Sequence, residues 1–230
     1  MHLESVTSTQ EVARGLPLGS VVVADHQTAG RGRGDRVWET PPGTALLASF
    51  VVPPQPLLSL ACGVAAAEAC GARVRLKWPN DLLLGGRKVG GILVEAGPRK
   101  AVVGIGINLS WAPPGAARLG QDRDRLLTRL RAALERWCSA PAEEVLAAWR
   151  RRSDTLGRQV RVWLPSGVIE GRAEDVDQSG ALIVDGQPVS VGDVIHVRPG
   201  RRARPAAAGS RPSGRAAPRR RSDRRGSAPR

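Results

Sequence analysis

The sequence predicts an α+β fold in which a mixed β-sheet carries helices and is followed by a small C-terminal β-barrel. Up to about residue 155, short Val- and Leu-containing runs bounded by Gly and Pro alternate with stretches whose apolar residues recur at helical spacing. From Leu156 the apolar residues alternate with polar ones, as in half-buried strands. The 230 residues suffice for one to two domains, each with a core of its own.

The first domain is expected to interleave strands with helices. Short apolar runs predict buried strands over residues 21–24, 45–52, 74–76, 92–95 and 101–107. Gly-rich turns separate the last three of these strands. Helices are predicted over 57–70, over 126–137 and, after the break at Pro141, over 142–152.

A second, smaller unit is expected after residue 155. Val160, Val162 and Leu164 alternate with other residues, and the chain turns before a second strand over 168–175. The dipeptide Asp185-Gly186 predicts a tight hairpin after a strand over 182–184. Five short strands in about 43 residues favour a small barrel that packs on the first domain. The predicted boundaries are therefore 1–155, 156–199 and, for a C-terminal tail, 200–230.

The positive charge is concentrated in that tail. Eleven arginines and one aspartate lie in residues 201–230, which therefore carry +10 of the net charge of +14. The tail has no Leu, Ile, Val or aromatic residue, so it is predicted to be disordered. Arginine-rich tails can bind nucleic acid without sequence preference, and a nucleic-acid-binding module is one alternative function.

Cysteine usage and hydropathy indicate a cytoplasmic protein. The three cysteines form neither a disulfide framework nor a paired zinc motif, which predicts free, buried thiols in a reducing compartment. Residues 1–14 contain no apolar signal-peptide core. Residues 40–67 are uncharged, but Pro53, Pro54 and Pro56 divide them, so no membrane span is expected.

An anion site is predicted by the segment Gly30-Arg-Gly-Arg-Gly-Asp-Arg-Val-Trp38. Its glycines let backbone N–H groups approach a ligand, and its arginines present guanidinium groups suited to phosphate or carboxylate oxygens. The segment lacks the spacing of a Walker loop or a dinucleotide fingerprint. A solvated basic loop or an RGG-like RNA contact is the alternative interpretation.

A second polar cluster follows a predicted strand at Lys77-Trp-Pro-Asn-Asp81. Taken alone, Lys77 is interpreted as an ordinary charge at a strand end. A functional interpretation of Lys77 is favoured by the segments that follow it, namely Lys88, Gly90-Gly-Ile-Leu-Val-Glu95 and Gly104-Ile-Gly-Ile-Asn108. Small residues in these strands leave room for a flat ligand against the sheet.

In this order, the four segments resemble the catalytic domain of biotin protein ligases, whose pattern is G-R-G-R-x-G-R-x-W, K-W-P-N-D, G-G-I-L-x-E and G-x-G-x-N. The resemblance covers about residues 5–109, and Thr7-Ser-Thr-Gln10 is similar to the family's S-T-N motif. It implies a fold like that of class II aminoacyl-tRNA synthetases with an SH3-like C-terminal domain. It also implies ATP-dependent formation of biotinyl-5′-AMP, followed by transfer of biotin to a lysine of a biotin carboxyl carrier protein.

The resemblance further implies which residues form the site. Lys77 and Arg33 are expected to be catalytic, Lys77 by holding the biotin carboxylate and the charge at the α-phosphate. Residues expected to bind biotin are Ser8, Thr9, Gln27, Arg31, Lys77, Gly90, Gly91 and Gly104. Residues expected to bind ATP or the adenylate are Arg31, Arg33, Arg36, Trp38, Asn80, Gly106 and Asn108. Mg²⁺ is expected to accompany ATP through phosphate oxygens and water, with no protein ligand named.

Three departures from the family pattern bear on these expectations. Asp35 replaces the second loop glycine, while Gly34 stands one place earlier. The chain begins close to Ser8, which leaves little room for the upstream strand and helix of many relatives. No N-terminal helix-turn-helix precedes the catalytic segment, so a DNA-binding repressor role is not implied. A lipoate or octanoate ligase of the same fold is the enzymatic alternative, and either a monomer or a homodimer fits the sequence.

Overall fold

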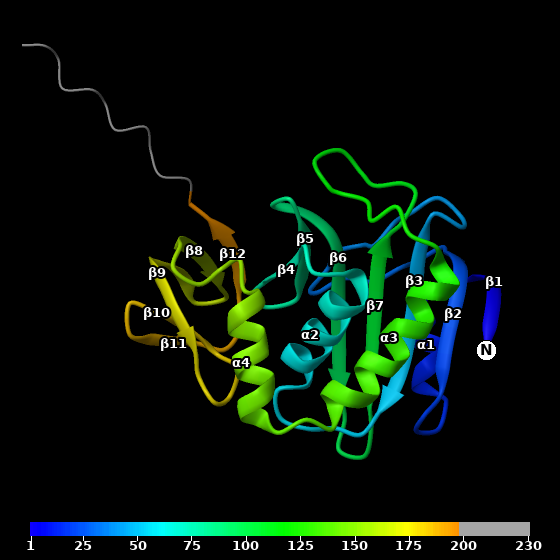
Figure 1. Ribbon diagram of the computed structural model, residues 1–230, viewed down its shortest axis with the longest axis horizontal. Helices are drawn as coiled ribbons and strands as arrows, with labels where there is room; N and C mark the ends of the chain where they lie inside the picture. Colours follow the sequence, from blue (N-terminus) through cyan, green and yellow to red (C-terminus); the bar gives the residue numbers. More distant parts are fainter. Residues whose placement is uncertain (198–230) are drawn as a thin grey trace, which may run out of the picture. The chain divides into compact units, whose positions relative to one another are not determined.

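A seven-stranded mixed sheet forms the centre of the computed structural model, which describes residues 1–197 (Figure 1). The sheet order is β1-β2-β3-β7-β6-β5-β4, with β1 parallel to β2 and every other neighbouring pair antiparallel. Its strands are β1 (His2–Val6), β2 (Val21–Gln27), β3 (Ala45–Val52), β4 (Val74–Lys77), β5 (Asp81–Leu84), β6 (Arg87–Ala96) and β7 (Ala101–Asn108). The helices are α1 (Thr9–Arg14), α2 (Leu58–Cys70), α3 (Arg123–Cys138) and α4 (Ala142–Arg152).

Strand alternation gives the sheet two differently covered faces. On one face Val23, Phe50 and Val103 join the main core with α2, α3 and α4, and Figure 1 shows α2 and α3 in front of the strands. On the other face Val22 and Val51 pack with the short helix α1 in a separate small cluster. The α1 face is therefore only partly covered by apolar packing, and this leaves space for a site.

Helix α2 is buried along almost its whole length. Its residues are mostly small and apolar, and they let the helix lie close to the sheet and to α3. Cys62 and Cys70 face this core as predicted, and burial raises the pKa of the Cys70 thiol to about 12. Cys138, at the end of α3, is half-buried.

The elements missing from the sequence prediction are short. They are β1, α1 and β5: β1 carries polar residues and lies at the sheet edge, α1 has only six residues, too few to show helical periodicity, and β5 has only four. β1 lies upstream of Ser8, so the short segment before Ser8 contains a strand. Helix α1 begins after Ser8, whose side chain accepts a hydrogen bond from the Gln10 N–H. The other predicted elements are confirmed, with ends moved by a few residues.

The C-terminal part forms a separate five-stranded antiparallel sheet of order β11-β10-β9-β8-β12. Its strands are β8 (Gln159–Leu164), β9 (Gly167–Val176), β10 (Leu182–Val184), β11 (Gln187–Val189) and β12 (Asp193–His196). The five strands were predicted, whereas closure into an SH3-like barrel and the domain boundaries stay predictions. The predicted tail, 200–230, lies outside the described residues. No helix among residues 1–197 is both long and apolar enough to cross a membrane.

Contacts with the first sheet anchor the C-terminal sheet. The indole of Trp78 donates a hydrogen bond to the Gly180 carbonyl, and the Trp78 backbone N–H donates to the Thr155 hydroxyl, at 3.1 and 3.0 Å. Arg150 forms an ion pair with Asp175 across the same junction at 2.6 Å. Trp78 is almost fully buried, so its two donors need these partners. The two sheets pack together as the sequence predicted.

Candidate active site

The candidate site is a trough on the α1 face of the seven-stranded sheet. Antiparallel register aligns Leu47, Gly106 and Gly91 in one row across β3, β7 and β6, and Ser49, Gly104 and Leu93 in the next row. Paired residues share a face of the sheet, so the three glycines remove side chains from one continuous strip. The resulting cavity encloses about 620 Å³, its open mouth included.

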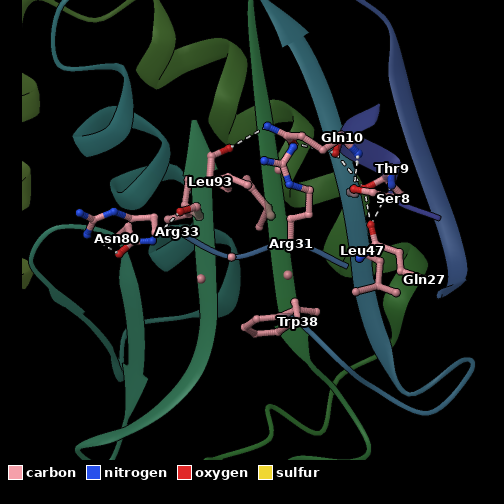
Figure 2. A pocket seen from close by; sticks show the side chains of 18 of the residues that line it. Ser8, Thr9, Gln10, Gln27, Arg31, Arg33, Trp38, Leu47, Asn80 and Leu93 are labelled. Carbon is pink, nitrogen blue, oxygen red and sulfur yellow. Dashed lines mark hydrogen bonds between the residues drawn. The ribbon is translucent and has the colours of Figure 1, made fainter. Parts of the chain in front are cut away.

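Neutral polar side chains line one end of the trough (Figure 2). The backbone N–H and the hydroxyl of Thr9 both donate to the Gln27 side-chain carbonyl, at 2.8 and 3.0 Å, and the Thr9 hydroxyl also lies 2.8 Å from that of Ser49. Because the Gln27 carbonyl is satisfied in this way, its amide group keeps donor capacity for a ligand. Ser8 and Thr9 are almost fully buried, so these groups are held in place by packing.

Gln10 completes this polar end, although the sequence predicts no specific role for it. Its amide nitrogen donates to the Val102 carbonyl at 3.1 Å, and its amide oxygen accepts from Ser49 at 3.2 Å. A Cβ at Gly104 would lie 2.4 Å from that oxygen, so glycine is needed there to make room for Gln10. The Thr7–Gln10 motif and the Gly104–Asn108 segment therefore pack against each other through Gln10 and Gly104.

Positive side chains line the rest of the trough, and each has an acidic or carbonyl partner. Arg31 pairs with Glu95 at 3.2 Å, and the Arg33 guanidinium donates two hydrogen bonds to the Gly192 carbonyl, both at 3.2 Å. The remaining pairs are Arg36 with Asp193 and, at 2.6 Å, Lys88 with Asp81. The Arg14 and Arg31 guanidiniums lower the pKa of Glu95, mainly through the Arg14 hydrogen bonds. This end of the trough is suited to an anion.

The Trp38 indole lies across the glycine strip (Figure 2). A Cβ at Gly106 would come within 2.7 Å of the ring, whereas one at Gly91 would stay 3.6 Å away. The Lys88 ammonium lies 5.7 Å from the ring centroid. The buried indole Nε1 has no hydrogen-bond partner among residues 1–197.

Lys88 lines the trough although strand alternation places it on the opposite face from Gly91. The pairing of β5 with β6 shifts from Leu82↔Gly90 to Leu83↔Lys88, which makes Val89 an extra residue in β6. This bulge turns the Lys88 side chain onto the trough face. Lys88 carries no predicted role, because a bulge reverses the face that a period of two predicts.

Lys77, which the resemblance assigns to the biotin carboxylate, lies outside the trough lining. It continues the Gly106–Gly91 row, but Asp81 lies between it and Gly91. Lys77 instead lines an adjoining cavity together with Arg36, Asn80 and Asp193. Burial lowers the pKa of its ammonium. Because Arg36 and Asn80 line both cavities, the two spaces are neighbours.

Asn108 and Gly90 are also absent from the trough lining. The buried Asn108 amide donates to the Ala117 carbonyl at 3.0 Å, which fixes the loop after β7. Gly90 faces the core, where a Cβ would lie 2.8 Å from the Gly106 carbonyl. Both positions therefore support the sheet. The other predicted site residues come together around the trough, namely Ser8, Thr9, Gln27, Arg31, Arg33, Arg36, Trp38, Asn80, Gly91, Gly104 and Gly106.

The Arg-Gly loop accommodates its departure from the family pattern. Gly34 has φ +61°, a left-handed conformation that favours glycine, so the shifted glycine serves the turn. Asp35 is exposed. The Gly32 N–H donates to the Arg36 carbonyl at 2.7 Å and closes the loop.

Comparisons with known proteins agree with this geometry. Residues 3–111 match the biotin/lipoate A/B protein ligase family, and residues 155–197 match the biotin protein ligase C terminal domain. The chain is 38% identical to the biotin--[acetyl-CoA-carboxylase] ligase of Mycobacterium tuberculosis, an alignment that covers 78% of this chain and 80% of that protein. It is 35% identical to the Paracoccus denitrificans ligase of the same name, over 76% and 88% of the two chains. The chain belongs to the biotin protein ligase family.

A solved structure of this family has the same fold. Biotin protein ligase from Aquifex aeolicus, in complex with biotin and ATP, superimposes with a TM-score of 0.74 at 29% identity, over 86% of this chain and 98% of that one. The predicted α+β fold is thus confirmed. The C-terminal match is to biotin protein ligases, so the lipoate ligase alternative is not favoured.

Proposed function

We propose that this chain is a biotin protein ligase that uses ATP to form biotinyl-5′-AMP and then transfers biotin to a lysine of a biotin carboxyl carrier protein. The observation that carries the proposal is the trough itself. A neutral, hydrogen-bonding end and a cationic end share one strip of sheet from which glycines remove the side chains. This arrangement suits a ligand with an uncharged polar ring at one end and phosphates at the other.

In the first step an oxygen of the biotin carboxylate attacks the α-phosphorus of ATP, and pyrophosphate leaves with the electron pair of the broken P–O bond. A carboxylate needs no general base, so the protein contributes positioning and charge stabilisation. The Lys88 ammonium lines the trough beside Trp38 and Asp81 and is assigned to the charge at the α-phosphate. Arg31, Arg33 and Arg36 are assigned to the phosphates.

At the polar end, the proposal assigns the ureido ring of biotin to the side chains of Ser8, Thr9 and Gln27. The free amide protons of Gln27 are donors for the ring carbonyl, and Gln10 sets the end of the trough. These groups are already hydrogen-bonded to one another, so the ligand meets a preorganised site. Lys77, in the adjoining cavity with Arg36, is assigned to the pyrophosphate that leaves.

In the second step the lysine amine of the carrier attacks the acyl carbon of the mixed anhydride, and AMP leaves. Trp38 and the loop that bears it exclude water from the anhydride, which hydrolyses when exposed. The indole N–H, which has no partner in the described part of the chain, is assigned as a donor to the adenylate. The carrier domain of a carboxylase is the proposed acceptor.

Mg²⁺ is proposed to enter with ATP. Carboxylates near the phosphate end, Asp81 and Asp193, are engaged with Lys88 and Arg36. Within the described residues no cluster of three His, Cys, Asp or Glu side chains forms a metal site. Phosphate oxygens and water are the proposed ligands, and the ion would neutralise part of the triphosphate charge. A cytoplasmic location and a monomer or homodimer remain part of the proposal.

Pyrophosphate release by the purified protein tests the function. ATP and Mg²⁺ are supplied with biotin, lipoate or octanoate as parallel acids, and release without acid is the blank. Release that depends on biotin is expected, because the polar end is assigned to the ureido ring. Release with lipoate or octanoate alone would instead assign the trough to the related acyl ligases.

A further inference from the structure

Two arginines of the nucleotide end are held by one turn of the C-terminal sheet. Arg33 donates both Nη groups to the Gly192 carbonyl at 3.2 Å, and its Nη1 lies 3.9 Å from the Asp193 carboxylate. Arg36 forms an ion pair with the other oxygen of the same carboxylate. The turn is more than 150 residues away from both arginines in sequence.

The backbone of this turn is fixed by close packing. Gly192 has φ +146°, and a Cβ there would lie 2.6 Å from Val162 and 2.9 Å from both the Leu164 side chain and the Trp163 carbonyl. Only glycine allows the backbone at position 192 to lie this close to β8. The Gly192 carbonyl and the Asp193 carboxylate are consequently presented to the loop from a rigid support.

The guanidinium groups of Arg33 and Arg36 cannot donate the same hydrogen bonds to the turn and to a nucleotide at the same time. Both Arg33 and Arg36 line the trough, and carboxylate and phosphate oxygens use the same paired N–H donors of a guanidinium. Asp193 also lines the adjoining cavity and adds a negative charge beside the space assigned to phosphates. Its carboxylate is therefore a competitor of the polyphosphate.

We propose that Gly192 and Asp193 form a latch that holds Arg33 and Arg36 on the C-terminal sheet until nucleotide phosphates replace it. The latch rests on the proposed function and makes Asp193 a determinant of ATP affinity. The Arg33, Arg36 and Asp193 side chains are 29, 57 and 46% exposed. Ion pairs with this exposure are weak enough for a phosphate to displace.

Replacing Asp193 by asparagine tests the latch. Loss of the carboxylate frees both guanidiniums, so the Kd for ATP with Mg²⁺, measured by calorimetry, is expected to fall by roughly threefold to tenfold. The Kd for biotin is expected to stay unchanged, and Asp193→Glu is expected to restore the wild-type ATP affinity. Hydrogen exchange of the amides in residues 31–37, without any ligand, is expected to accelerate in Asp193→Asn.

Asp175→Asn is the matched control, because it removes the same charge from the same sheet where Asp175 pairs with Arg150. It is expected to change neither the ATP Kd nor exchange in the loop. Weaker ATP binding by Asp193→Asn would overturn the latch, because the carboxylate would then position the arginines for the nucleotide. Values equal to those of the control would overturn it as well. If the wild-type protein binds no ATP, the proposed function fails, and the exchange rates alone decide whether the latch contact exists.

Discussion

Replacement of Lys88 by alanine separates the roles of the two lysines near the trough. The Lys88 ammonium lies 2.6 Å from Asp81 and 5.7 Å from the Trp38 ring centroid, with the side chain 40% exposed. An ion pair this exposed contributes about 0–1 kcal/mol to stability, so the variant is expected to fold. Loss of a preorganised group that stabilises transition-state charge costs about 2.7–4 kcal/mol, which is roughly a 10²–10³-fold loss in kcat.

Biotin-dependent exchange of labelled pyrophosphate into ATP measures this step without a carrier protein. Lys88→Ala is expected to lose kcat, whereas Lys77→Ala is expected mainly to raise the KM for ATP, because Lys77 lies beyond Asp81 in the adjoining cavity. Lys100→Ala serves as the control, since the Lys100 ammonium only caps the Arg14 and Leu16 carbonyls at 2.7 Å. A larger loss of kcat in Lys77→Ala than in Lys88→Ala would refute the assignment.

Three further predictions follow from the packing. In Gly104→Ala the new Cβ would lie 2.4 Å from the Gln10 amide oxygen, so the amide must move, and the KM for biotin in pyrophosphate exchange is expected to rise by about tenfold. In Gly106→Ala the Cβ displaces the Trp38 ring, and release of biotinyl-5′-AMP, followed by filtration and mass spectrometry, is expected to accelerate by about tenfold. Burial, together with nearby positive charges, lowers the pKa of His196 below its usual 6.5. The unfolded chain therefore binds the proton more readily than the folded chain. The free energy of unfolding is expected to fall as the pH drops below 6.5. Urea unfolding at several pH values measures this, and His196→Gln is expected to lack that part of the pH dependence.

Each of these predictions has a control variant or an outcome that would contradict it. Gly15→Ala, at the end of α1, adds a methyl group whose nearest neighbour is 3.7 Å away, and it is expected to leave the biotin KM unchanged. Gly91→Ala, on the same strip as Gly106, is expected to affect adenylate release less, because its Cβ stays 3.6 Å from Trp38. Equal effects in Gly91→Ala and Gly106→Ala would contradict the role of Trp38. A wild-type stability that is flat between pH 8 and pH 5.5 would contradict the account of His196, because the loss of stability is expected to begin as the pH falls through 6.5.

The sequence predicts the parts of the site that local spacing controls. Glycines and arginines in residues 30–38 indicate an anion-binding loop, and small residues in Gly104–Asn108 indicate an open sheet surface. Both lie in the trough as expected, since the alternation of a regular strand determines which residues share a face. The Asn108 side chain shares that strand but turns to the Ala117 carbonyl, a partner that the strand pattern does not indicate.

The remaining features depend on long-range geometry. The bulge at Val89 moves Lys88 onto the trough face, and the residue types in β6 do not predict this bulge. Lys77 belongs to the predicted motif, yet the register of β4 with β5 puts Asp81 between it and the trough. The contact of Arg33 with Gly192 joins two sheets that sequence spacing does not relate. Such features follow only from how the strands and the two sheets are packed.

Transfer of biotin to a carrier lysine is the most direct test of the central claim. The purified chain is incubated with ATP, Mg²⁺, biotin and the carrier domain of a carboxylase, and the carrier is analysed by mass spectrometry. The account predicts the mass gain of one biotinyl group on a single lysine, with a large loss of rate in Lys88→Ala. An unmodified carrier together with no biotin-dependent pyrophosphate release would contradict the assignment of the trough to biotin and ATP.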